Sequence, residues 1–75
     1  MHFIIYYFLI MITGTVKFFN DSKGFGFITN DETGKDIFVH VSGMKSHTLN
    51  EGDKVSYVEE DGKKGMMATK VEVIR

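Results

Sequence analysis

The chain has 75 residues, which limits it to one small domain, since a chain of this size buries only about 60% of the surface that its unfolded form exposes. It has no cysteine, which excludes a disulfide framework and a thiolate metal site and is consistent with a reducing compartment. Its formal net charge of −1 excludes a strongly basic nucleic-acid binder, so any such binding must depend on local lysine clusters and on stacking.

The start of the chain, MHFIIYYFLIMI, differs from all that follows, because residues 3–12 are apolar or aromatic and carry no charge. This run is too short for a membrane-spanning helix, which needs roughly 20 residues, and it lacks the n-region and cleavage site of a secretory signal. A buried strand, an adhesive β-prone segment and a peripheral membrane anchor remain open. We expect residues 1–12 to form an apolar extension, and residues 1–10 to be an over-extended gene start, with Met11 as the functional start.

From Thr13 onward, short runs that favour strands alternate with turns rich in Gly, Asp and Asn. The predicted strands are residues 13–20, 25–29, 36–41, 54–60 and 66–74. No segment shows apolar spacing at i, i+3, i+4 and i+7 over ten residues, so the pattern predicts no long helix, and at most a single helical turn in residues 42–50. Five strands with such turns are typical of an all-β barrel or sandwich.

Side-chain alternation in DIFVHV separates core from surface, because successive side chains in a strand point to opposite faces. Ile37, Val39 and Val41 share one face, and their β-branched side chains predict that this face belongs to the core. Phe38 and His40 then lie on the outer face.

The stretch KGFGFI, residues 23–28, sets Phe25 and Phe27 on one face of a strand, with Gly26 between them. Phenylalanines are usually buried, so both rings could belong to an ordinary core. A small barrel has only one interior, however, and Ile28 on the opposite parity is the better core residue, while a glycine suits a tight barrel bend. The alternation therefore predicts an outward aromatic platform, with lysines at its edge: Phe25, Phe27, Phe38 and His40, bordered by Lys17, Phe18 and Lys23.

Aromatic rings beside cations on an open sheet suit unstacked bases. Each stacked base contributes about 1–3 kcal/mol, and every base has a π-face, so stacking tolerates many sequences. A duplex hides these faces. The platform therefore predicts binding to single-stranded nucleic acid, with weak or no binding to duplexes.

The motifs GTVKFFN, KGFGFI and DIFVHVS resemble the first-strand motif and the two RNP-type motifs of the cold-shock domain family. They stand in the family's order, and the resemblance runs from about Gly14 to Val73. KGFGFI alone also resembles the RRM pattern, but that fold needs two helices and more chain. The resemblance implies that residues 13–75 form a five-stranded antiparallel OB-fold barrel. It also implies a cytoplasmic, monomeric protein that binds single-stranded RNA and DNA, as an RNA chaperone or cold-shock regulator. No enzymatic activity, cofactor, small-molecule substrate or stable membrane association is expected.

Carried onto matching positions, the resemblance implies ten nucleic-acid-binding residues: Lys17, Phe18, Asn20, Lys23, Phe25, Phe27, Asp36, Phe38, His40 and Lys64. The rings are expected to stack on bases and the three lysines to contact phosphates. Asn20 and Asp36 are expected to hydrogen-bond to base edges.

Several positions depart from the family pattern. Phe18 stands where many members carry tryptophan, and Val41 stands where a further aromatic residue often lies. The loop after the third strand is short and lacks the family's aromatic residue, with His47 the nearest substitute. The pair Met66–Met67 replaces a turn exit that contains proline. These departures predict weaker binding, or a shorter bound strand, than in members with more aromatic residues.

Two other function classes are less consistent with the sequence. An enzyme is disfavoured because no catalytic set can be assembled, and Asp36 with His40, although on one face, supplies only two of the ligands that a metal site needs. An OB-fold module whose aromatic patch binds a protein is the alternative function, which the lysines around the patch disfavour.

Overall fold

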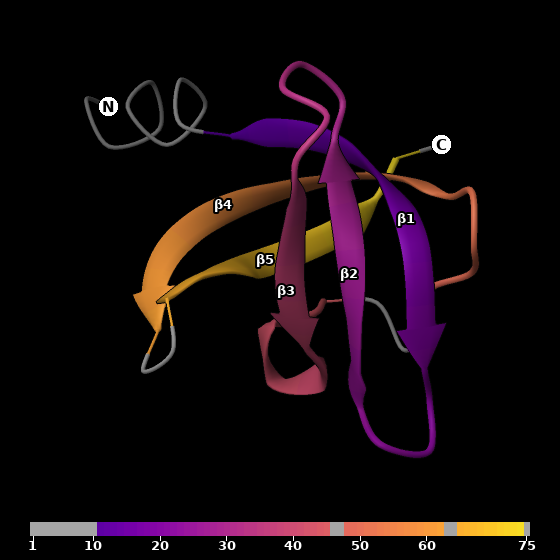
Figure 1. Cartoon of the computed structure of the whole chain (residues 1–75). Coiled ribbons are helices and arrows are strands. Elements are labelled where there is room, and N and C mark those ends of the chain that lie inside the picture. The colour runs from indigo at the N-terminus through magenta and orange to yellow at the C-terminus, as the bar shows by residue number, and fades with distance from the viewer. Residues whose placement is uncertain (1–10, 46–47, 63–64, 75) are drawn as a thin grey trace, which may run out of the picture.

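The computed structural model describes residues 11–45, 48–62 and 65–74. Five strands form a closed barrel (Figure 1): β1 (Ile12–Asn20), β2 (Phe25–Asn30), β3 (Asp36–His40), β4 (Lys54–Gly62) and β5 (Gly65–Val73). A single 3₁₀ turn, η1 (Val41–Gly43), follows β3. The prediction of an all-β barrel is confirmed, and the described residues contain no long helix, as expected. In the described ranges, no helix has the length and apolar character needed to cross a bilayer. Residues 1–10, His47 and Lys64 lie outside the described residues.

The strand order around the barrel is β1-β2-β3-β5-β4, and the last strand pairs with the first. All neighbours are antiparallel except β3 and β5, which pair in parallel through Phe38↔Met67 and Val39↔Ala68. Five is an odd number, so strand directions cannot alternate all the way around a closed ring, and one parallel junction is unavoidable. The antiparallel prediction is therefore correct apart from this junction.

The core lies inside the barrel and is built from inward-facing side chains of all five strands and Leu49 of the long loop. Its buried members are Val16, Ile28, Ile37, Val39, Leu49, Val55, Tyr57, Ala68 and Val71. The prediction that Ile28, Ile37 and Val39 are core residues is confirmed. The prediction for Val41 is wrong: its side chain is 46% exposed, because β3 ends at His40 and the chain turns into η1, where the alternation of the strand no longer applies.

Strand β1 carries an irregularity where it pairs with β2. The register between these strands shifts between Val16 and Phe18, which is a bulge that increases the local twist. Gly26 lies opposite Phe19, and a Cβ at Gly26 would overlap the Phe18 carbonyl oxygen and come within 2.8 Å of the Phe19 Cα. The backbones therefore approach too closely here for any side chain, in agreement with the predicted role of this glycine.

Candidate nucleic-acid interface

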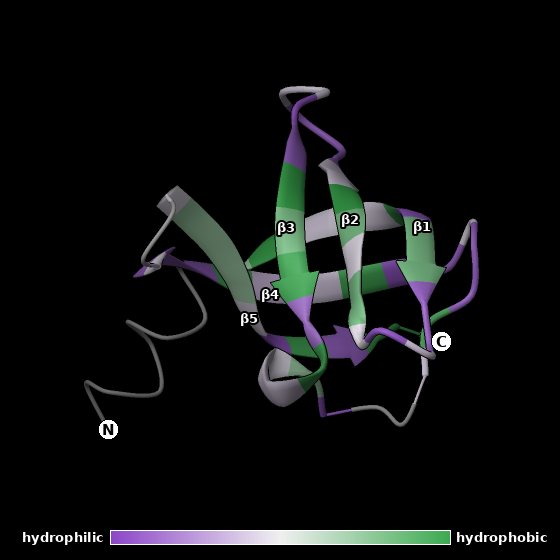
Figure 2. Cartoon of the chain, turned by 60° about the horizontal axis from the view of Figure 1, so that its bottom comes forward, coloured by the Kyte–Doolittle hydropathy of each residue, from purple (hydrophilic) through white to green (hydrophobic). Residues whose placement is uncertain are grey.

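Four phenylalanine rings from three adjacent strands form one cluster, called the aromatic surface below: Phe18 of β1, Phe25 and Phe27 of β2, and Phe38 of β3. The strand register brings them together, since Phe18 and Phe38 lie on either side of Phe27. Figure 2 shows the hydrophobic parts of β2 and β3 side by side on the barrel wall. Phe18 and Phe27 are 39% and 37% exposed, whereas Phe25 and Phe38 are half-buried.

The rings hold one another in place. Phe25 stacks on Phe38 at a centroid distance of 6.0 Å and meets Phe18 and Phe27 edge-on at 6.1 and 6.5 Å. Phe27 meets Phe38 edge-on at 6.0 Å. Such aromatic pairs are favourable beyond the area that they bury. Phe25 and Phe38 therefore form the base of the surface, on which the more exposed Phe18 and Phe27 are fixed.

Lys17 and Asp36 are joined to each other. Lys17 Nζ donates to Asp36 Oδ2 at 2.7 Å, and Thr29 Oγ1 donates to Asp36 Oδ1 at 2.8 Å. The hydrogen bond from Lys17, and then that from Thr29, hold the pKa of Asp36 below its ordinary value. The carboxylate is thus ionised at neutral pH and partly neutralises the lysine that sequence reasoning assigned to a phosphate.

Asn20 and Lys23 lie at the turn between β1 and β2. The Lys23 backbone N–H donates to Asn20 Oδ1 at 3.0 Å, and the Gly24 N–H donates to the Asn20 carbonyl at 2.8 Å. Gly24 has a φ of +74°, which favours glycine. The Asn20 oxygen therefore shapes the turn, and contact with a base edge would fall to its NH₂ group. Lys23 is exposed beside the aromatic surface.

His40 is exposed at the end of β3, opposite Phe25 in the register. The Ser42 backbone N–H donates to His40 Nδ1 at 3.1 Å, and Ser42 Oγ lies 2.9 Å from the same nitrogen. Because Nδ1 accepts the backbone proton, the proton of the neutral ring is on Nε2. The 3₁₀ turn thus fixes the orientation of the ring, and Ser42 is a residue of the site that sequence reasoning missed.

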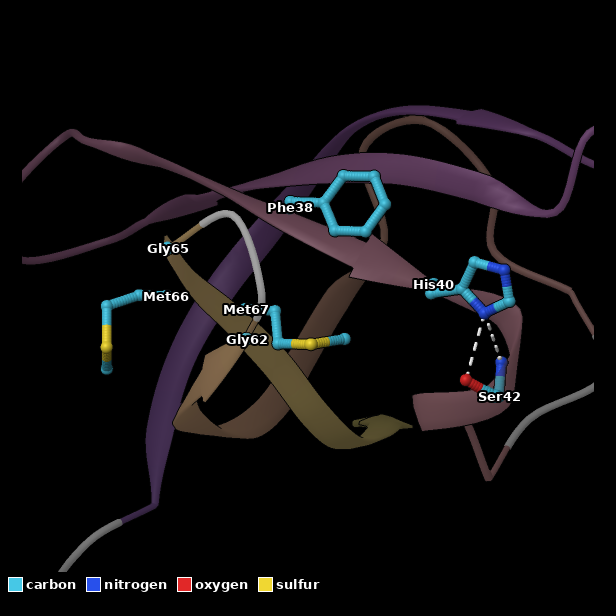
Figure 3. Close-up of a pocket in the computed structure, with 7 residues that line it drawn as sticks. All are labelled: Phe38, His40, Ser42, Gly62, Gly65, Met66 and Met67. Carbon is cyan, nitrogen blue, oxygen red and sulfur yellow. Dashed lines mark hydrogen bonds between the residues drawn. The ribbon is translucent and has the colours of Figure 1, made fainter.

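A groove of about 520 Å³ continues from Phe38 and His40 toward the β4–β5 hairpin (Figure 3). We call it the methionine groove, and its lining is Phe38, His40, Ser42, Gly62, Gly65, Met66 and Met67. The parallel junction creates it, because that pairing sets Met67 beside Phe38. Sequence reasoning noted the unusual Met66–Met67 pair but had no register with which to place it at the site.

The described residues contain no group of three His, Asp or Glu side chains able to hold a metal ion. Asp36 and His40 have separate partners, since Lys17 and Thr29 occupy the carboxylate and Ser42 occupies Nδ1. What the site offers is a set of rings, a few cations and an apolar groove, which is an arrangement for binding.

Comparison with known proteins identifies the chain. Residues 12–74 match the "Cold-shock" DNA-binding domain family. Cold shock protein CspV of Vibrio cholerae serotype O1 is 51% identical over 63 residues, which cover 80% of this chain and 90% of that protein. Major cold shock protein CspA of Pseudomonas aeruginosa is 53% identical over 64 residues, which cover 81% and 91%.

Among solved structures, drosophila Unr CSD456 superposes with a TM-score of 0.71 at 19% identity, over 87% of this chain and 27% of the other. The chain thus spans about a quarter of that structure, and the likeness shows the shared fold. With the family match over most of its length, the chain belongs to the cold-shock domain family, whose members bind nucleic acids and are not enzymes.

Proposed function

We propose that this protein binds single-stranded RNA and DNA through the aromatic surface and acts as an RNA chaperone or cold-shock regulator. The observation that carries the proposal is the cluster of four rings on three adjacent strands, two of which are more than a third exposed. Apolar rings are costly to expose to water, and flat bases are ligands that such rings stack on with little dependence on sequence.

Phe18 and Phe27 present the largest exposed ring areas and are the proposed sites of base stacking. Each stacked base adds about 1–3 kcal/mol. Phe38 and His40 continue the path toward the methionine groove. A base enters such a path only when it is unpaired, so binding shifts the equilibrium of weak RNA hairpins toward their open form.

The electrostatic part of binding is small and local. Lys23 is exposed at one edge of the aromatic surface, and Lys17 must exchange Asp36 for a phosphate in order to contribute fully. Lys64 is proposed as a third phosphate contact. Three contacts predict that the logarithm of the binding constant falls with the logarithm of salt concentration at a slope of roughly −2. Asp36 and Asn20 are proposed to read base edges.

We further propose that the protein acts as a cytoplasmic monomer without stable membrane association, and that the binding domain lies within residues 13–75 together with Ile12, which belongs to β1 and pairs with Tyr57. A single binding domain is supported by the alignment with CspV, which covers 90% of that relative.

The test is fluorescence anisotropy with a labelled oligopyrimidine, as RNA and as DNA, beside the corresponding duplex at two salt concentrations. Phe27→Ala is expected to weaken single-strand binding about 5- to 100-fold. Ile74→Ala, which removes an apolar side chain that is 45% exposed and lies outside the aromatic surface, is expected to change it less than about twofold. A folded chain that ignores single strands would overturn the proposal and favour a protein partner for the rings.

A further inference from the structure

The methionine groove has two thioethers in its lining, Met66 and Met67, and no charged side chain among its described lining residues. Met66 is 49% exposed, and Met67 is half-buried. In Figure 3 the Met67 side chain extends along the groove in the direction of His40, while Met66 points the other way. Both residues lie near the start of β5, which pairs with β3 through Met67 and Phe38.

Two glycines lie beside the thioethers in the described part of the hairpin. Gly62 and Gly65 also line the groove and have no side chain to shield the thioethers. A Cβ at Gly62 would lie 2.9 Å from Met67 Sδ, so the sulfur occupies the space that a side chain at Gly62 would fill. Gly65 has a φ of +125°, a backbone conformation that favours glycine. The exposure of the sulfurs is thus tied to the geometry of the hairpin.

We propose that Met66 and Met67 are a reversible oxidation site through which peroxide weakens binding of single-stranded nucleic acid. This inference rests on the proposed function, since it concerns the same binding surface. The oxidant is hydrogen peroxide. A thioether lone pair attacks one peroxide oxygen, an S–O bond forms as the O–O bond breaks, and the second oxygen leaves as hydroxide. The hydroxide then takes the proton of the S–OH⁺ group and becomes water. Sulfur loses two electrons, peroxide gains them, and the products are methionine sulfoxide and water.

Oxidation changes the groove where it meets the aromatic surface. A sulfoxide replaces a flexible apolar group by a polar and bulkier one, directly beside Phe38 in the β3–β5 register. A base or sugar that enters the groove then loses its apolar contact with Met67 and must displace water from the S=O group. Both effects weaken binding, and neither alters the core.

The other described methionines serve as internal references. Met44 is half-buried against the core, whereas Met66 is 49% exposed, so Met66 is expected to react faster than Met44. Met11 is 37% exposed but does not line the groove. The order of oxidation is therefore expected to place Met66 ahead of Met44 and Met67, which are both half-buried, and the oxidation of Met11 is expected to leave binding unchanged.

The experiment uses the full chain. Affinity for a labelled oligopyrimidine is measured first on untreated protein, then after graded treatment with hydrogen peroxide, and again after reduction by methionine sulfoxide reductases of both stereospecificities. Peptide mass spectrometry assigns the oxidised residues. The same series is run on Met66→Leu/Met67→Leu and, as the matched control, on Met11→Leu. Leucine conserves volume well enough for both variants to fold.

Wild type and Met11→Leu are expected to bind about three- to tenfold more weakly after oxidation, with recovery on reduction. Met66→Leu/Met67→Leu is expected to bind with the same affinity before and after peroxide treatment, whatever its starting affinity. An equal loss in that variant, an unchanged affinity with residues 66 and 67 fully oxidised, or oxidation of Met44 before Met66 would each overturn the inference. Absence of binding by the untreated protein would overturn the proposed function instead, and the first titration distinguishes that result.

Discussion

Lys17 and Asp36 form an ion pair that reaches across strand β2, with 2.7 Å between Lys17 Nζ and Asp36 Oδ2. Thr29, on the strand between them, donates to the other carboxylate oxygen. The three residues thus connect the three strands that carry the aromatic surface. The pair is exposed on both sides, at 61% and 37%, so its contribution to stability is small, and its lysine is accessible to a phosphate.

The Lys17–Asp36 ion pair is expected to lose its contribution to stability in acid. Lys17, and after it Thr29, lower the pKa of Asp36 from its ordinary value of 3.8. A carboxyl group with a lowered pKa in the folded state contributes stability above its unfolded pKa, and loses it as the pH falls through the folded value. Asp36→Asn should therefore lower the free energy of unfolding at pH 7, and this difference from wild type should shrink below about pH 4. Urea unfolding at pH 7, 5 and 3 measures it.

Lys17→Met is the matched variant for that experiment, because it removes the other partner and should converge with wild type over the same pH range. The second exposed ion pair, Lys54–Asp31, is unchanged in both variants, so its own loss in acid cancels in the comparison. A difference between wild type and Asp36→Asn that stayed constant down to pH 2 would show that the pair does not stabilise the fold.

Gly26→Ala is expected to be severely destabilising. A Cβ at this position would overlap the Phe18 carbonyl oxygen and lie 2.7 Å from Phe19 Cδ1. Backbone cannot move aside as a flexible side chain can, so the cost should be roughly 2–4 kcal/mol. Gly34→Ala is the control: Gly34 has a φ of +73° but open space around it, and should cost only about 1–2 kcal/mol. Chemical denaturation compares them, and equal costs would contradict the steric argument.

The strands and the inward parity of Ile28 and Val39 were predictable, because both depend on local signals: turn residues between runs, and alternation within a run. Val41 shows where that reasoning stops. Its residue type continues the strand pattern, but the Ser42 N–H bonds to His40 Nδ1 and the chain turns into η1. Alternation holds only while the chain remains extended, and the residue types alone do not mark the residue at which the strand ends.

In the candidate site, too, some features follow from local signals and others depend on contacts between distant segments. The outward rings follow from alternation on β2 and β3, whereas the Lys17–Asp36 pair and the methionine groove depend on registers between strands that are distant in sequence. Lys17 reaches Asp36 because of the bulge in β1, and Met67 meets Phe38 only because the barrel closes through a parallel junction. Neither register leaves a signal within one segment. Sequence reasoning could therefore identify these residues but could not predict which of them are neighbours in the fold.

Phe25 and Phe27 are expected to respond differently to truncation, although they are two residues apart on one face. Phe25 contacts three other rings and is half-buried, so Phe25→Ala should lower the free energy of unfolding by roughly 2–4 kcal/mol. Phe27 is 37% exposed, so Phe27→Ala should cost less stability while weakening single-strand binding directly. Paired unfolding and anisotropy measurements on each variant test this. Equal stability losses would mean that the rings share the structural role.

Tyr57 carries a buried hydroxyl group that has no hydrogen-bond partner among the described residues. The side chain is fully buried, and in the described part of the chain no group forms a hydrogen bond with its Oη. Burial above all, and then the charges of Glu59 and Asp31, raise the pKa of Tyr57 to about 12, which the side chain of Asn30 opposes only in part. Removing an unpaired buried hydroxyl is close to neutral or stabilising, so Tyr57→Phe should unfold at the same free energy at pH 7 or up to about 1 kcal/mol higher.

The larger effect of Tyr57→Phe should come in alkali. A group whose folded pKa lies above its unfolded value of 10.0 contributes stability in full below the unfolded pKa and loses it as the pH rises through the folded one. Wild type should therefore lose up to about 2 kcal/mol relative to Tyr57→Phe between pH 10 and pH 12. Lysine deprotonation destabilises both proteins alike and cancels. Urea unfolding followed by circular dichroism measures the difference without interference from Tyr6 and Tyr7 absorbance. If the free energies of unfolding of the two proteins changed in parallel across that range, the Tyr57 hydroxyl would be in contact with water, and its ionisation would not be linked to folding.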